Sequence, residues 1–142
     1  MSGGLAQHLL ELVNFEEFVN KLLDIIFQTQ KLGQYKEIIV NSLDLLIPLV
    51  IYRPTLISLL QNRENLEELI AETLIMSDDE SIRLAFEATI SNLCDNLDEQ
   101  FNPREFFLNI LLKYIPAKDQ VMAQCDNYFN LLIHLVSLKE TE

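Results

Sequence analysis

Apolar residues recur along this chain at intervals of three and four, the spacing that places side chains on one face of an α-helix. One such stripe follows the spacing i, i+4, i+8 and i+11 and consists of Ile82, Phe86, Ile90 and Leu93. A second stripe consists of Tyr128, Leu131, Leu132 and Leu135. Glycine and proline number only three and four, too few for the turns of a β-rich domain. The pattern predicts an all-α fold.

Helix starts recur with a common signature: Asn, then Glu three positions later, then two large apolar residues. The Asn side chain can accept a hydrogen bond from a free backbone N–H, and the Glu can return a bond to the cap. A related start with Ser in place of Asn is predicted before residue 80. The predicted pairs of cap and third helical residue are Asn14 with Glu17, Asn65 with Glu68, Ser77 with Glu80, and Asn102 with Glu105.

These starts divide the chain into helix pairs. We expect pairs at about 14–52, 54–96 and 102–138, with an extra short helix within 53–61 and Pro48 kinking or shortening the helix that contains it. A leading helix is expected from Leu5 to Val13, and Asp119 is expected to cap the last helix. The helix starts at 14, 65 and 102 are separated by intervals whose mean, about 44 residues, matches the roughly 40–47 residues of one armadillo or HEAT repeat. The pattern therefore predicts one α-solenoid domain, residues 1–142, of about three stacked helix pairs plus a leading helix.

One motif resembles a family. The run Asp79-Glu80-Ser81-Ile82-Arg83-Leu84-Ala85 is similar to the opening of the second helix in HEAT repeats. This resemblance implies that Arg83 braces neighbouring repeats through an acidic group, with Asp79 as candidate partner. The other second helices lack the arginine, so the sequence leaves the HEAT and armadillo classes both open.

Two further segments, Cys125–Leu132 and Pro103–Phe107, resemble the helical, non-catalytic regions of large ubiquitin-specific proteases. That resemblance implies a segment that recruits substrates, with the protease centre elsewhere.

The net charge of the chain limits the classes of molecule that it is expected to bind. The chain has 10 basic and 22 acidic residues, a formal net charge of −12. It lacks the clustered cations that displace counterions from nucleic acid, and anionic membranes are disfavoured for the same reason. The acidity either keeps an apolar protein soluble or forms a groove for a basic peptide. The sequence leaves both interpretations open.

No catalytic or metal-binding pattern is present. The two histidines, His8 and His134, lie far apart in sequence, and neither belongs to an HExxH motif. We interpret His134 as a polar-edge residue or one bonded to a backbone carbonyl. Cys94 and Cys125 have no partnering histidine and are expected to be buried free thiols. The sequence predicts no enzyme, no cofactor and no metal site.

Two features of the sequence bear on the cellular compartment of the protein. The longest apolar stretch, Ile38–Tyr52, contains polar residues and Pro48 and is too short to span a bilayer. The chain starts without a secretory signal. These features, together with the free thiols, predict a cytoplasmic or nuclear protein.

Two functional hypotheses remain. In the first, a non-catalytic scaffold binds another protein or peptide along one face of its stacked helices, and the charge favours a basic partner. Aromatic candidates for that face are Phe15, Tyr35, Tyr52 and Tyr114. In the second, the chain is a structural part of a longer solenoid that packs or self-associates through its terminal helices. Apolar candidates for this end are Phe129, Leu132, Ile133 and Val136.

Overall fold

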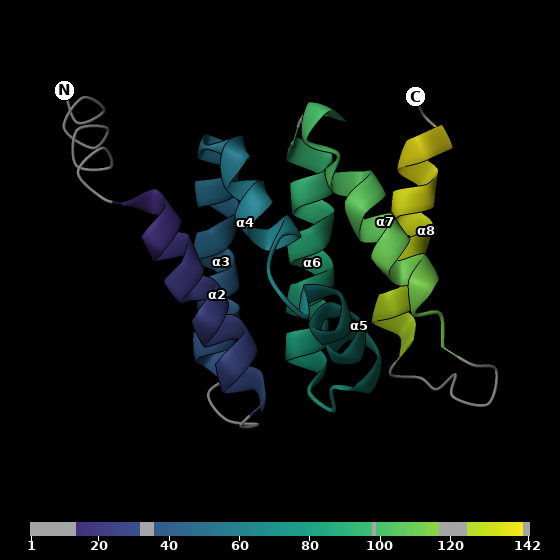
Figure 1. Cartoon of the computed structure of the whole chain (residues 1–142). Helices are drawn as coiled ribbons and strands as arrows, with labels where there is room; N and C mark the ends of the chain where they lie inside the picture. The colour runs from purple at the N-terminus through teal and green to yellow at the C-terminus, as the bar shows by residue number, and fades with distance from the viewer. Residues whose placement is uncertain (1–13, 32–35, 98, 117–124, 141–142) are drawn as a thin grey trace.

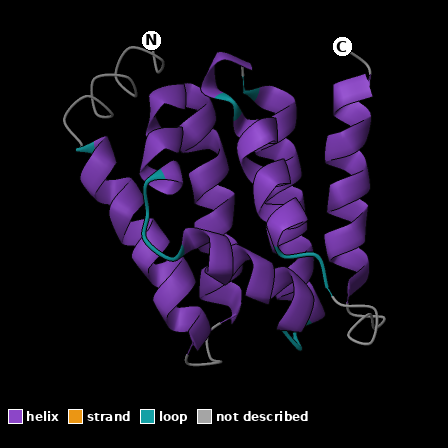
Figure 2. Ribbon diagram, turned by 45° about the vertical axis from the view of Figure 1, so that its right-hand side comes forward, coloured by secondary structure: helices purple, strands orange, loops and turns teal. Residues whose placement is uncertain are grey.

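The structure, a computed structural model, describes residues 14–31, 36–97, 99–116 and 125–140. Over these ranges it contains seven α-helices and no strand, so the predicted all-α class is confirmed (Figure 2). Two short 3-10 helices, η1 (Pro54–Leu56) and η2 (Glu99–Phe101), join them. The predicted helix Leu5–Val13 and the cap Asp119 lie outside the described residues. The α-helices are α2 (Phe15–Lys31), α3 (Lys36–Tyr52), α4 (Ile57–Gln61), α5 (Leu66–Met76), α6 (Glu80–Asn96), α7 (Pro103–Lys113) and α8 (Asp126–Glu140).

The helices pack as three successive pairs. Helix α2 packs on α3, α5 on α6, and α7 on α8. The second helices also contact one another in the order α3, α6, α8. In Figure 1 the first helices α2, α5 and α7 lie in front of this row, which runs from α3 to α8. Helix α6 therefore occupies the middle of the molecule.

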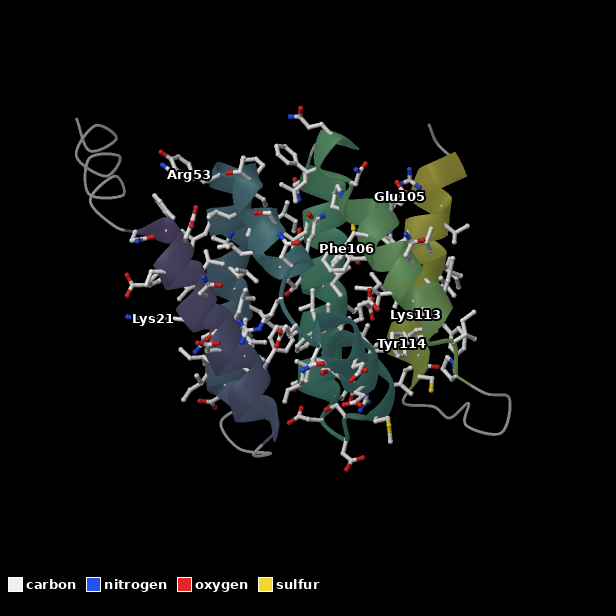
Figure 3. The ribbon with its side chains drawn as sticks, in the orientation of Figure 1. Lys21, Arg53, Glu105, Phe106, Lys113 and Tyr114 are labelled. Atoms are coloured by element: carbon white, nitrogen blue, oxygen red, sulfur yellow. The ribbon has the colours of Figure 1, made fainter. Side chains whose placement is uncertain are left out.

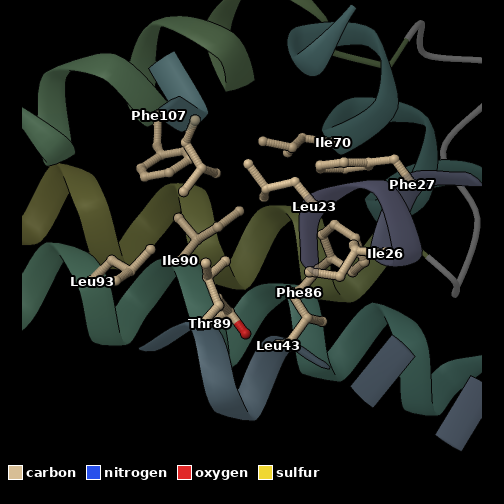
Figure 4. A pocket seen from close by; sticks show the side chains of 12 residues that line it. Leu23, Ile26, Phe27, Leu43, Ile70, Phe86, Thr89, Ile90, Leu93 and Phe107 are labelled. Atoms are coloured by element: carbon tan, nitrogen blue, oxygen red, sulfur yellow. The ribbon is translucent and has the colours of Figure 1, made fainter. Parts of the chain in front are cut away.

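One continuous core joins the pairs. It runs from Phe15 and Val19 of α2, through α3, α5 and α6, to Tyr128 and Leu135 of α8. Tyr128 is fully buried, and its hydroxyl donates a hydrogen bond to the Leu111 carbonyl. A space of about 20 Å³ remains between α2, α3 and α6 (Figure 4). Among its lining side chains only Thr89 is polar, and a buried water needs two to four polar partners. We therefore regard this space as a gap in the apolar packing.

The long linker between the first two pairs forms the predicted extra helix. Residues 54–61 form η1 followed directly by α4. Helix α3 does not end at Pro48 but continues to Tyr52. Pro48 removes the hydrogen bond to the carbonyl of Asp44, and both residues are exposed. Water can therefore hydrate that carbonyl, so the proline does not shorten the helix.

The four predicted helix caps do not share one geometry. At α2, Asn14 Oδ1 accepts a hydrogen bond from the backbone N–H of Glu17 at 3.1 Å. Asn65 and Asn102 instead adopt the left-handed conformation, with φ of 61° and 52°, and make no side-chain capping bond. The prediction of capping boxes with Glu68 and Glu105 is therefore wrong. Side-chain capping needs an extended backbone at the cap, whereas asparagine tolerates left-handed turns better than most residues.

The start of α6 lies two residues later than Ser77 predicts. Asp79 is the cap, and its Oδ1 accepts hydrogen bonds from the N–H groups of Ser81 (2.9 Å) and Ile82 (3.3 Å). Ser77 Oγ accepts from the N–H of Asp79 at 3.3 Å and so stabilises the turn before the helix. Glu80 is the first helical residue instead of the third. A carboxylate is favoured at this position because it interacts with the positive end of the helix dipole.

Candidate protein-interaction surfaces

Arg83 joins the second and third helix pairs from a buried position. Its side chain is only 9% exposed. Its Nη1 donates to the carbonyl of Ser77 at 2.5 Å, and its Nε donates to Asn127 Oδ1 at 3.2 Å. Asn127 Nδ2 in turn donates to Glu87 Oε1 at 2.8 Å. This network connects α8 to both α6 and the loop before it.

The acidic partner implied for Arg83 is wrong. Asp79 caps α6, and its Oδ2 lies 3.8 Å from Lys36 Nζ on α3. A carbonyl and an amide accept the guanidinium protons instead, and the bond to Asn127 links α6 to α8. Neutral acceptors can satisfy a buried guanidinium, because burial requires above all that its N–H groups be hydrogen-bonded.

The row of second helices exposes a face that we call the outer face. It lies opposite the buried positions of these helices and includes four apolar residues. The largest of these side chains, Leu45 and Leu84, are 51% and 55% exposed. Apolar residues of the outer face are Leu45 and Pro48 on α3, and Leu84 and Ala88 on α6.

Acidic side chains accompany these apolar residues on the second helices. Among the described side chains of α3, α6 and α8 there are two lysine or arginine residues. Lys36 is paired with Asp79, and Arg83 is buried in its network. The exposed carboxylates of the three helices, by contrast, are Glu37, Asp44, Glu80, Asp95 and Asp126. The outer face is therefore both apolar and acidic.

A cleft of about 300 Å³ opens on the opposite side of the molecule, between α5 and α7. Lys113 of α7 reaches across to α5, with its Nζ 2.8 Å from Glu67 Oε2. The hydrogen bond and the charge of Glu67 raise the pKa of Lys113. Figure 3 looks onto this side and labels three lining residues. The cleft is lined by Gln61, Arg63, Asn65, Leu66, Glu67, Glu68, Phe106, Lys113 and Tyr114.

The last pair exposes an apolar surface that we call the end face. It consists of Leu112 and Ile115 from the end of α7, with Ile133 and Val136 from α8. These side chains are 50%, 54%, 63% and 40% exposed, respectively. Phe129 and Leu132, predicted for the same end, are half-buried and pack against the core instead.

The candidate reactive groups are engaged or buried. His134 was predicted to be a polar-edge residue or one bonded to a backbone carbonyl; its side chain is 39% exposed, and its Nε2 lies 2.8 Å from a carboxylate oxygen, Asp95 Oδ1. Both cysteines are buried, and neither forms a disulfide bond. Burial, with a smaller contribution from Asp95, raises the pKa of Cys94 to about 12. Its thiol is therefore protonated at neutral pH and is a poor nucleophile.

The described ranges contain neither a potential metal cluster nor a helix that could span a membrane. These ranges bring no three His, Cys, Asp or Glu residues together as a potential metal site. None of their helices is long and apolar enough to cross a membrane.

The contacts that sequence reasoning missed are long-range. Asn127 carries no motif, and it meets Arg83 only because α8 packs beside α6. The Glu67–Lys113 pair joins residues 46 positions apart. Asp79 carried a usable signal, since Asp before a helix is as good a cap as Ser. Comparison with known proteins adds no further guide: no family model, no curated protein and no solved structure matches the chain.

Proposed function

We propose that this protein is a non-catalytic scaffold that binds a basic protein or peptide along its outer face. The observation that carries the proposal is the outer face itself, where exposed Leu45 and Leu84 lie on helices that also expose carboxylates and have no free lysine or arginine among the described side chains of α3, α6 and α8. An apolar centre with charged surroundings is typical of surfaces that bind proteins.

The arrangement of the helices supports a short α-solenoid of the armadillo or HEAT kind. Three successive pairs stack through their second helices, so each pair contacts mainly its neighbours. Such stacks offer an extended surface made of one helix from each pair. Arg83, in the segment that resembles a HEAT motif, links neighbouring pairs. Two buried cysteines that form no disulfide fit a reducing compartment, the cytoplasm or nucleus.

Binding of charge-reversed peptides across a salt series tests the proposal. The probes are a fluorescein-labelled peptide of alternating Lys and Leu and its Glu–Leu counterpart, followed by anisotropy. We expect the Lys–Leu peptide to bind and to weaken as salt screens the charges, while the Glu–Leu peptide does not bind. Equal binding of both peptides, or of neither, contradicts the proposal.

A second candidate function is supported by the end face. Terminal units of helical stacks normally present a polar outer surface, yet Ile133 and Ile115 are 63% and 54% exposed. The chain would then be part of a longer stack, such as the substrate-recruiting region of a large deubiquitinase, or would self-associate through this end. Light scattering tests this reading, since Ile133→Asp should convert a concentration-dependent dimer into a monomer. A wild-type chain that stays monomeric at high concentration contradicts self-association.

A further inference from the structure

The cleft between α5 and α7 contains one carboxylate, Glu68, that forms no ion pair with a described side chain and contributes only its charge to the raised pKa of Lys113. Arg63 is already balanced, because its Nη2 lies 2.6 Å from Asp24 Oδ1. Lys113 is balanced by Glu67. Glu68, which also lines the cleft, is exposed and has no ion-pair partner among the described side chains. The cleft can therefore accept one more positive charge.

Aromatic side chains line the same cleft. Lys113 Nζ lies 5.6 Å from the centroid of the Tyr114 ring, within the range of a cation–π contact. Phe106 is half-buried on α7 and also lines the cleft. Figure 3 labels Phe106 beside the upper part of α7, and Lys113 and Tyr114 at its lower end. Lys113 thus shows where a cation is stabilised, between a carboxylate of α5 and an aromatic ring of α7.

We propose that this cleft binds an arginine side chain from an extended segment of a partner protein. A guanidinium pairs with a carboxylate through two parallel hydrogen bonds and stacks on aromatic faces, which an ammonium does less well. The guanidinium lies between Glu68 and the rings of Tyr114 and Phe106. Lys113 competes with it for the carboxylates of Glu67 and Glu68. The net charge of −12 attracts such a segment from solution.

This site is separate from the outer face, because it is built by first helices on the other side of the row. Arginine binding in the cleft can therefore be tested independently of peptide binding on the outer face. Peptide binding mapped residue by residue distinguishes the two, since the cleft and the outer face share no residue.

The test is a ¹H–¹⁵N NMR titration with the peptide acetyl-Gly-Arg-Leu-Gly-amide. We expect shifts at the amides of Glu67, Glu68 and Tyr114. Replacement of the arginine by citrulline, a neutral analogue of similar shape, should reduce the affinity about tenfold or more because a charge-assisted pair is lost. Shifts confined to outer-face amides such as Leu45 and Leu84 would overturn the proposal.

Three variants sharpen the test. Glu68→Gln should weaken binding about tenfold, whereas the matched control Glu16→Gln, an exposed acid on α2, should leave it unchanged. Lys113→Met removes the competing cation and should strengthen binding several-fold. Circular dichroism verifies that each variant is folded. Equal losses for Glu68→Gln and Glu16→Gln would show non-specific attraction and would overturn the proposal, as would unchanged binding in Lys113→Met.

Discussion

Helix α6 packs against its two neighbours in different ways. Toward α3, its contacts surround an apolar space lined by Phe86 and Ile90 of α6 and by Leu43 and Leu46 of α3. Toward α8, buried apolar residues are accompanied by hydrogen bonds from Arg83 and Glu87 to Asn127. Apolar burial stabilises without direction, whereas hydrogen bonds hold only at one geometry. The α3 side therefore supplies stability, and the α8 side also fixes register.

The largest effect is expected on the apolar side. Phe86 is 3% exposed, and its ring centroid lies 6.2 Å from that of Phe27. Phe86→Ala should lower the free energy of unfolding by about 3–5 kcal/mol, because it removes buried surface and leaves a cavity. Urea denaturation measures the change. Leu84→Ala, an exposed position on the same helix, is the control and should cost under about 1 kcal/mol. Equal losses for the two variants would refute this description of the core.

A moderate and localised effect is expected on the polar side. Arg83→Met keeps the apolar stem but removes the hydrogen bonds to Ser77 and Asn127. Because bonds from a charged donor contribute about 1.5–3 kcal/mol, the variant should lose about 2 kcal/mol. Hydrogen exchange should accelerate in α8 and not in α3. Uniform acceleration in both helices would show that Arg83 does not set the register of α8.

High pH should weaken the α6–α8 region. The pKa of Cys94 rises from an ordinary 9.0 to about 12, and that of Tyr128 from 10.0 to about 12, chiefly through burial. Folding thus favours the protonated groups, whose contribution is complete below pH 9 and is lost as the pH rises toward 12. At pH 10 the loss from Cys94 should be about 1 kcal/mol. Urea denaturation at pH 8 and pH 10 measures the change, and it should be smaller in Cys94→Ala. An unchanged pH dependence in that variant would contradict the assignment.

The smallest effect is expected for the exposed pair His134–Asp95. Their side chains are 39% and 42% exposed, and exposed ion pairs contribute about 0.2–1 kcal/mol. A double-mutant cycle with His134→Ala and Asp95→Ala at pH 6 should give a coupling energy in that range. A coupling above about 2 kcal/mol would mean that this contact, and not Arg83, holds α8 in place.

The sequence predicted the helices because helical periodicity is local. The start of α5, the end of α6 and the extra helix after Tyr52 all follow from apolar spacing and nearby turn residues. It did not predict the conformation of Asn65, because asparagine suits both a capping role and a left-handed turn. Only the path of the preceding chain decides between them.

The candidate surfaces were predictable only in outline. Of the aromatic candidates for a binding face, Phe15 is buried in the core, Tyr52 packs against the Phe15 ring, and Tyr114 lines the cleft. The sequence could not pair Glu67 with Lys113, since that contact depends on how α5 and α7 pack. The residue types on a surface can be read from a short stretch of sequence, whereas the shape of a cleft depends on how distant helices pack.

The most direct test of the proposed scaffold is the affinity of the labelled Lys–Leu peptide for an outer-face double variant, Leu45→Ser with Leu84→Ser. Anisotropy gives the Kd, and the matched control is Leu112→Ser with Ile115→Ser on the end face. Burial of an exposed leucine contributes about 1.5–3 kcal/mol, so the outer-face variant should bind at least about tenfold more weakly, while the control binds like wild type. Equal affinity of the two variants, or a loss confined to the end-face variant, would contradict the outer face as the binding surface.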